Sequence, residues 1–166
     1  IELKDNFLES KILLFDDDVI QAKNVKEQLS ELSGQVKVLT SLDEIDALGV
    51  FVPDLVIISC QIDTVDPLRI AVTLRSKPNF KNSVLMMLAD EENIPMVIKG
   101  MELGINDYFM YPVDKSELKA RVRTQLRRKQ YQDNLRSELE ESVDLSTKDG
   151  LTAVFNRRYF DIHVKQ

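Results

Sequence analysis

Short apolar runs alternate along this chain with stretches in which apolar residues recur at helical spacing. Each run has the length of a buried strand, and a helical stretch follows it. This alternation is typical of a parallel sheet whose strands are joined by crossover helices. We therefore expect strands at residues 11–15, 36–39, 54–59, 84–88 and 106–109.

Four helical stretches lie between these runs, and Gly34 and Gly104 are well placed to end the first and the fourth of them. Their apolar positions are Ile20, Val25, Leu29 and Leu32; Leu42, Ile45 and Leu48; Leu68, Ala71, Val72 and Leu74; and Ile94, Val97, Ile98 and Met101. With a fifth helix after the last strand, the pattern predicts a flavodoxin-like, doubly wound five-stranded parallel sheet. In such a sheet the ligand site lies at the carboxyl ends of the strands.

The fifth helix is much longer than the others. From Ser116, a suitable N-cap, to about Thr147 the chain contains neither Gly nor Pro, which predicts a helix of roughly 45 Å. The helix has two apolar stripes, which are Leu118, Val122 and Leu126, and further along Leu135, Leu139, Ser142 and Val143. We expect the first stripe to pack on the sheet. We expect the second to project and to need a partner, either a second copy or the next domain.

Composition limits the function classes. No apolar stretch approaches the length of a membrane span. The chain has one cysteine, Cys60, so it cannot form an internal disulfide, which fits a cytoplasmic protein. We expect Cys60 to be a small core residue rather than a reactive thiol. Residues 1–113 carry a net charge of −9 and residues 114–166 a net charge of +3. An acidic body is unsuited to nucleic acid, and the basic residues of the long helix are spread around it.

Three consecutive carboxylates, Asp16, Asp17 and Asp18, follow the first apolar run. An acidic cluster at a strand end is typical of a Mg²⁺ site for phosphoryl chemistry. The neighbouring run at 54–59, however, ends in Ser59, where a further acid would be needed. Asp18 is also well placed to cap the following helix.

Two segments resemble the response regulator receiver family, whose fold is CheY-like. Residues 11–18 resemble its opening strand and acidic pair, and residues 53–59 resemble its third strand. In that family the last residue of the third strand is the aspartate that accepts a phosphoryl group. The family's Met-Asp-Gly element would place its last two residues at Asp66 and Pro67, so the alignment holds without a gap and the position of the acceptor falls on Ser59.

The resemblance implies two more losses. The fourth strand should end in a Thr or Ser that bonds the phosphoryl oxygen, and here it ends in Leu88. The fifth should end in a Lys-Pro pair with a cis peptide bond, and here the pair is Tyr111-Pro112. The phosphoacceptor site is thus degenerate at three positions, Ser59, Leu88 and Tyr111. None of these residues supplies the acceptor carboxylate, the hydrogen-bond donor to the phosphoryl oxygen or the positive charge. Asp16 and Asp17 remain as an acidic pocket that holds Mg²⁺ weakly at most.

The tail carries a second resemblance. Residues 149–159 are similar to the entry of a GGDEF diguanylate cyclase domain, although Ala153 replaces a usual Gly and no Gly-Gly-Asp/Glu-Glu-Phe segment follows. The matching positions are Asp149, Leu151, Thr152, Asn156, Arg157 and Arg158. We therefore expect a linker helix from a preceding domain at 1–10, a pseudo-receiver at 11–130, a projecting linker helix at 131–147 and the truncated start of a GGDEF domain at 148–166.

This arrangement is similar to the second receiver of PleD-type response regulators. It implies a non-enzymatic adaptor that mediates dimerisation and signal transmission in a cyclic di-GMP pathway. Its partners would be a receiver of the same or a second chain and a GGDEF domain. The alternative is a phosphorylatable receiver with another output, whose acceptor is Asp54 or Asp63. A flavodoxin-like enzyme is disfavoured because no glycine-rich phosphate loop is present.

Overall fold

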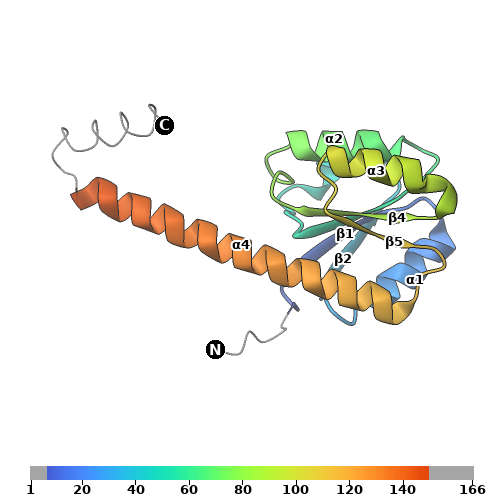
Figure 1. Ribbon diagram of the computed structural model, residues 1–166, viewed down its shortest axis with the longest axis horizontal. Coiled ribbons are helices and arrows are strands. Elements are labelled where there is room, and N and C mark those ends of the chain that lie inside the picture. Colours follow the sequence, from blue (N-terminus) through green and yellow to red (C-terminus); the bar gives the residue numbers. More distant parts are fainter. Residues whose placement is uncertain (1–6, 150–166) are drawn as a thin grey trace. The chain divides into compact units, whose positions relative to one another are not determined.

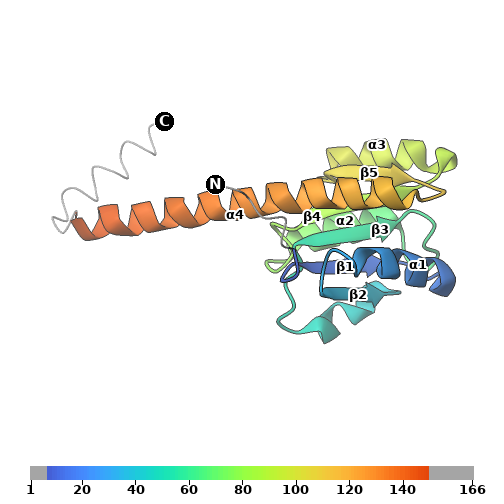
Figure 2. The same ribbon diagram turned by 90° about the horizontal axis from the view of Figure 1, so that it is seen from below.

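The computed structural model describes residues 7–149, and it contains a parallel five-stranded sheet with the strand order β2-β1-β3-β4-β5 (Figure 2). The strands are β1 (Lys11–Phe15), β2 (Gln35–Leu39), β3 (Leu55–Ser59), β4 (Val84–Ala89) and β5 (Asp107–Met110). Each lies within a residue or so of an expected run. The predicted doubly wound, CheY-like architecture is confirmed.

Helices cover both faces of the sheet, as the crossover connections require (Figure 1). The helices are α1 (Val19–Leu29), α2 (Pro67–Ser76), α3 (Ile94–Glu102) and α4 (Lys115–Asp149). One core lies between the sheet and the helices α1 and α4, and the other lies between the sheet and the helices α2 and α3. Every residue of β3 and β4 is buried, because these inner strands are covered on both faces.

The short helix expected around residues 42–48 is not a continuous helix. It consists of two single-turn 3₁₀ helices, η1 (Leu42–Glu44) and η2 (Asp46–Leu48), whose hydrogen bonds join residues three apart. The Glu44 carboxylate folds back and accepts hydrogen bonds from the backbone N–H groups of Thr40 and Ser41. Gly49 then ends the segment with a φ of 61°, a conformation that favours glycine.

The long helix α4 begins one residue before Ser116, so the prediction that Ser116 is its N-cap is wrong. The Asp114 carboxylate accepts a hydrogen bond from the Ser116 backbone N–H at 2.8 Å, and the Asp114 carbonyl accepts one from the Leu118 N–H. Asp114 therefore caps the helix, because its carboxylate satisfies a donor that has no partner within the helix. The expected packing stripe is confirmed, since its members are buried at 1% exposure or less: Leu118, Val122 and Leu126.

The chain divides into two compact units, residues 1–129 and 130–166. In the described part of the second unit, α4 continues to Asp149, and the apolar side chains of Tyr131, Leu135, Leu139 and Val143 are exposed. Apart from the backbone of Asp149, the GGDEF-like positions lie outside the described residues, as do residues 1–6. In the part of the chain that the structure describes, no helix is long and apolar enough to cross a membrane.

Candidate functional site: a filled receiver pocket

Three polar side chains meet at the carboxyl edge of the sheet, where the ligand site was expected. Asp16 follows β1, Ser59 ends β3 and Tyr111 follows β5. The Ser59 hydroxyl lies 3.2 Å from the Tyr111 hydroxyl. Because successive side chains of a strand point to opposite faces of the sheet, both residues lie on the face that α1 and α4 cover. The structure therefore brings together three of the positions that the sequence singled out.

A fourth side chain, Gln21, fills the space between them. Gln21 is the third residue of α1, so the start of the helix directs its amide toward the carboxyl edge of the sheet. Its Nε2 donates to the Asp16 carboxylate at 2.6 Å and to the Tyr111 hydroxyl, and it lies 3.5 Å from the Ser59 Oγ. With its oxygen accepting from Gln21, Tyr111 retains its own proton to donate to Ser59. The four side chains thus form one closed hydrogen-bonded network.

Asp16 is buried, with only 2% of the residue exposed. Burial raises the pKa of its carboxyl above the ordinary value, and hydrogen bonds from the Asp18 N–H and from Gln21 offset part of this effect. Nearby Asp18 and Asp17 also raise the pKa by repulsion. Burial likewise raises the pKa of the Tyr111 hydroxyl, which stays protonated at neutral pH. The network therefore contains no cation and no strong base that could activate the Ser59 hydroxyl.

Asp17 and Asp18 are both occupied by backbone donors. Asp17 Oδ2 accepts hydrogen bonds from the N–H groups of Asp63 at 2.8 Å and Thr64 at 3.3 Å, which fixes the loop after β3 to the end of β1. Asp18 accepts from the N–H groups of Ile20 and Gln21, so its predicted role as the cap of α1 is confirmed. Two of the three consecutive carboxylates thus have structural partners within the chain.

Leu88 pairs with Ser59 in the register of β3 and β4, and its side chain is completely buried in the core on the α1/α4 side. A buried leucine offers no hydrogen bond to an anion above it. The Tyr111-Pro112 peptide bond is cis, as the receiver resemblance implied. Cys60, directly after Ser59, is buried, and burial raises the pKa of its thiol to about 12, so it acts as a small core residue as expected.

Comparison with known proteins agrees with this geometry. Residues 12–123 match the response regulator receiver domain family. The chain belongs to that family. It is 35% identical over 153 residues to the response regulator PleD of Caulobacter vibrioides, an alignment that covers 92% of this chain. Because it covers only 33% of PleD, the chain spans about a third of that relative's length.

Solved receivers share the fold. A putative response regulator from Chloroflexus aurantiacus is 27% identical, with a TM-score of 0.64 over 70% of this chain and 97% of that one. A response regulator receiver modulated diguanylate cyclase from Pelobacter carbinolicus is 21% identical, with a TM-score of 0.62 over 76% of this chain and 99% of that one. The second likeness shows the fold alone.

Receiver domains typically bind Mg²⁺ at their phosphorylation site, but the residues of this receiver do not fit the ion. Mg²⁺ takes octahedral oxygen ligands and is commonly bound through carboxylates. Here the Asp16 carboxylate accepts a hydrogen bond from Gln21, and the Asp17 carboxylate accepts hydrogen bonds from two backbone N–H groups. The position of the third carboxylate is occupied by Ser59. Among the side chains that the structure describes, no three His, Cys, Asp or Glu residues are grouped so that they could hold a metal ion.

No sequence motif singled out Gln21. Its signal was its position: it is the third residue of the first helix, directly after the acidic cluster, and such a residue faces the carboxyl edge of the sheet. Glutamine is common on solvent-exposed helical surfaces, so only the contacts reveal its role.

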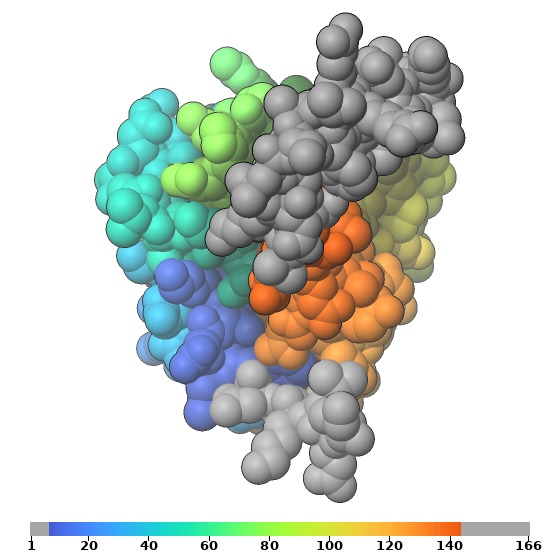
Figure 3. Space-filling model, turned by 90° about the vertical axis from the view of Figure 1, so that its left-hand side faces the viewer, coloured from blue at the N-terminus to red at the C-terminus, as the bar shows by residue number. Residues whose placement is uncertain are grey.

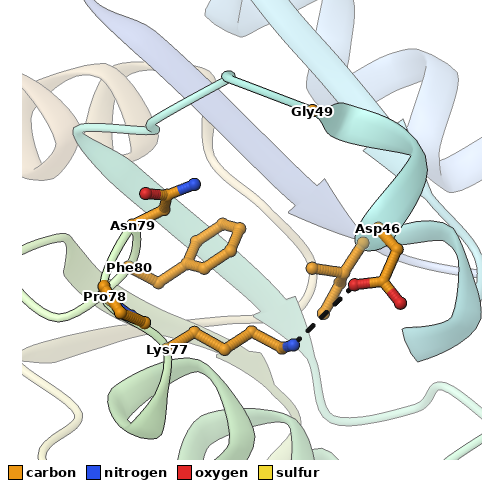
Figure 4. A pocket seen from close by; sticks show the side chains of 7 residues that line it. Asp46, Gly49, Lys77, Pro78, Asn79 and Phe80 are labelled. Atoms are coloured by element: carbon orange, nitrogen blue, oxygen red, sulfur yellow. Dashed lines mark ion pairs between the residues drawn. The ribbon is translucent and has the colours of Figure 1, made fainter.

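One surface hollow borders this network, and another lies elsewhere on the domain. One, of about 390 Å³, lies between α1 and the segment after β5, and Gln21 and Tyr111 form part of its wall. The other, of about 320 Å³, lies between η2 and the connection from α2 to β4, segments that are adjacent in Figure 3 (teal and green). In the second hollow Lys77 Nζ faces Asp46 Oδ1 at 3.9 Å (Figure 4). The Asp46 side chain is 93% exposed and the groups are at the limit of an ion-pair distance, so this pair stabilises little.

Proposed function

We propose that this chain is a non-phosphorylatable receiver that works as an adaptor, mediating dimerisation and signal transmission in a cytoplasmic response regulator whose output is a diguanylate cyclase. In this proposal it performs no reaction of its own. Its partners are a receiver domain of the same or a second chain and a GGDEF domain.

The filled pocket carries this proposal. Phosphorylation of a receiver needs an acceptor carboxylate, a metal ion and a cation, and the charge that arrives is about −1.5 to −2. Here the acceptor position is a serine. Leu88 stands where the hydrogen-bond donor to the phosphoryl group would be, Tyr111 stands where the cation would be, and Gln21 occupies the acidic pocket. With the chemical site replaced by an internal network, what remains for partners is the surface of the fold.

Two further observations support the output. The similarity to PleD fits the PleD-type arrangement that the sequence motifs indicated. Residues 149–159, which begin at the last residue of α4, resemble the entry of a GGDEF domain. A cyclase that joins two substrate molecules across a two-fold axis needs two output domains held together, and receiver pairing would supply this.

The surface formed by α3, β5 and α4 is our candidate for that pairing, and these three elements are neighbours in Figures 1 and 2. On α3, Ile98 is 57% exposed and Met101 is 43% exposed, and β5 is an edge strand of the sheet. Arg121 of α4 bonds Asp107 of β5 at 3.0 Å, which joins two of the elements into one polar rim. Apolar residues with a polar rim are the usual composition of a protein interface.

Sedimentation of an Ile98→Glu variant tests this surface. A charge placed in the centre of the contact should weaken dimerisation at least about tenfold, which corresponds to about 1.4 kcal/mol. The matched control is Val72→Glu on α2, a helix outside the surface formed by α3, β5 and α4, where a valine is similarly exposed at 49%. If both variants dimerise like the parent chain, pairing through α3, β5 and α4 is wrong.

The alternative acceptors receive no support from the geometry. Asp54 lies at the amino end of β3, the edge away from Asp16, and its carboxylate accepts from the Lys11 N–H at 2.8 Å. Asp63 lies in the loop that Asp17 holds through the backbone. Treatment with acetyl phosphate followed by intact-mass analysis should show no phosphorylated species, and a stoichiometric phosphorylated species would favour the alternative.

A further inference from the structure

The distal part of α4 carries an exposed apolar ridge with an unusual spacing. Tyr131, Leu135 and Leu139 are 62%, 46% and 69% exposed, and they follow one another at intervals of four residues. Residues four apart on a helix form a ridge inclined to the helix axis, whereas a coiled-coil seam needs an average spacing of 3.5 residues. The ridge therefore suits a partner helix that crosses α4 at a steep angle.

Charge along α4 is strongly segregated. Residues 115–136 carry eight Lys/Arg and two Asp/Glu, whereas residues 137–143 carry three Glu and no basic residue. Around the ridge, exposed Arg128 precedes Tyr131 by less than one turn, and exposed Glu138 lies beside Leu139. Two copies of this helix in parallel would place like charges together. Two antiparallel copies would place the basic part of each beside the acidic part of the other.

We propose that α4 pairs with α4 of a second copy of this chain in an antiparallel crossing, with Leu135 at the two-fold axis. In this arrangement Tyr131 of each copy packs beside Leu139 of the other, and Arg128 of each approaches Glu138 of the other. The contact is isologous, so each helix supplies both the basic and the acidic part. Its crossing geometry follows from the four-residue ridge, for which the preferred angle is about −50°.

The antiparallel pair has a functional consequence that differs from the proposed adaptor contact. It directs the carboxyl ends of the two α4 helices away from each other, whereas joint action of two output domains needs those ends together. The helix pair is thus a resting arrangement that competes with pairing through α3, β5 and α4. Its existence rests on α4 alone and does not depend on the proposed function.

Cysteine crosslinking tests the direction of pairing. In a Cys60→Ser background, chains carrying Tyr131→Cys are mixed with chains carrying Leu139→Cys and oxidised mildly. Antiparallel crossing predicts that disulfide dimers joining the two different chains exceed both homodimers several-fold. An excess of 131–131 and 139–139 dimers would show parallel pairing and would overturn the proposal.

Charge exchange supplies a second readout that needs no cysteine. Arg128→Glu alone and Glu138→Arg alone should each weaken association of the full chain several-fold in sedimentation, and the double variant should restore it, because the opposite charges still meet. Leu135→Glu should weaken association further. Ser137→Glu, on the opposite side of α4 two residues away, should leave association unchanged.

The outcomes separate the two contacts. Loss of association in Leu135→Glu but not in Ser137→Glu, with rescue by the charge exchange, supports the antiparallel helix pair. In an Ile98→Glu background, which removes the competing contact, association that Leu135→Glu leaves unchanged overturns it. Conversely, in a Leu135→Glu background, association that Ile98→Glu leaves unchanged contradicts the proposed adaptor surface and leaves the helix pair standing.

Discussion

At the residue scale, we propose that a polar network takes the place of the phosphorylation site of the receiver family. Gln21 donates both to the Asp16 carboxylate and to the Tyr111 hydroxyl, and Tyr111 bonds Ser59. Buried polar groups are costly unless they are satisfied, so these four side chains depend on one another. A receiver that had lost only its acceptor would retain an open acidic pocket, which this chain has filled.

Restoring the acceptor alone should therefore fail. Ser59→Asp adds a second carboxylate beside buried Asp16, without a cation and with Gln21 still in the pocket. We expect no phosphorylation by acetyl phosphate in this variant. Combining Ser59→Asp with Leu88→Thr, Tyr111→Lys and Gln21→Ala should permit it, because the acceptor, donor, cation and space are then all present.

Intact-mass analysis distinguishes these variants, and circular dichroism checks that each one folds. The informative comparison is the combined variant with and without Gln21→Ala, since Gln21 is the member that the receiver motif does not include. Efficient phosphorylation of Ser59→Asp alone would show that the network does not close the pocket.

The raised pKa of Asp16 predicts a specific dependence of stability on pH. The native state binds the Asp16 proton more tightly than the unfolded state, because burial disfavours the charged form. The contribution of Asp16 to the free energy of unfolding should therefore fall as pH rises from its ordinary pKa of 3.8 through the higher native value, and then level off.

Urea unfolding of the parent chain and of Asp16→Asn between acid and neutral pH checks the sign. The stability of the parent relative to the variant should decline across that window, because asparagine does not titrate. A relative stability that rises with pH would mean that the hydrogen bonds to Asp16 outweigh its burial.

At the scale of elements, α4 changes character along its length. Its first part packs Leu118, Val122 and Leu126 into the core, whereas Leu135 further along is about half exposed. The same helix is therefore a core element in the first unit and a surface element in the second. Apolar spacing in the sequence shows both stripes, and the burial of the first confirms the prediction that it packs on the sheet.

Truncation of one leucine in each stripe should separate these roles. Leu126→Ala removes a side chain that is 1% exposed and should lower the free energy of unfolding by about 2–5 kcal/mol. Leu135→Ala should change it by less than about 0.5 kcal/mol, because surface substitutions rarely cost more. Denaturant unfolding of both variants checks this, and equal losses would contradict the division.

The elements also show how far sequence reasoning reaches. The strands, the two-sided core and the position of the site followed from apolar periodicity, which depends on burial and is strong in a sheet covered on both faces. The cap of α4 and the two 3₁₀ turns did not follow, because they depend on which nearby carboxylate reaches a backbone donor: Asp114 rather than Ser116, and Glu44 folding back on Thr40. Gln21 was not predicted for the same reason, since its role depends on contacts with residues that lie 38 and 90 positions away in the sequence.

At the scale of the whole molecule, the receiver fold here is proposed to serve as a rigid body that presents surfaces. The loop after β3 is held by Asp17, and the pocket above the sheet is filled by Gln21. In a receiver that responds to phosphorylation, the phosphoryl group and its negative charge bind beside this loop and in this pocket. With both occupied by internal hydrogen bonds, we expect partners rather than phosphate to decide the state of this domain.

The most direct test is titration with Mg²⁺ and beryllofluoride, which together mimic the phosphorylated acceptor, monitored by amide NMR of the full chain. Our account predicts that the resonances of Asp16, Gln21, Ser59 and Tyr111 stay where they are at all concentrations, while a phosphorylatable receiver measured in parallel shifts. A saturable shift centred on Ser59 would contradict the account, because it would show that the pocket still accepts a phosphoryl group and its metal ion.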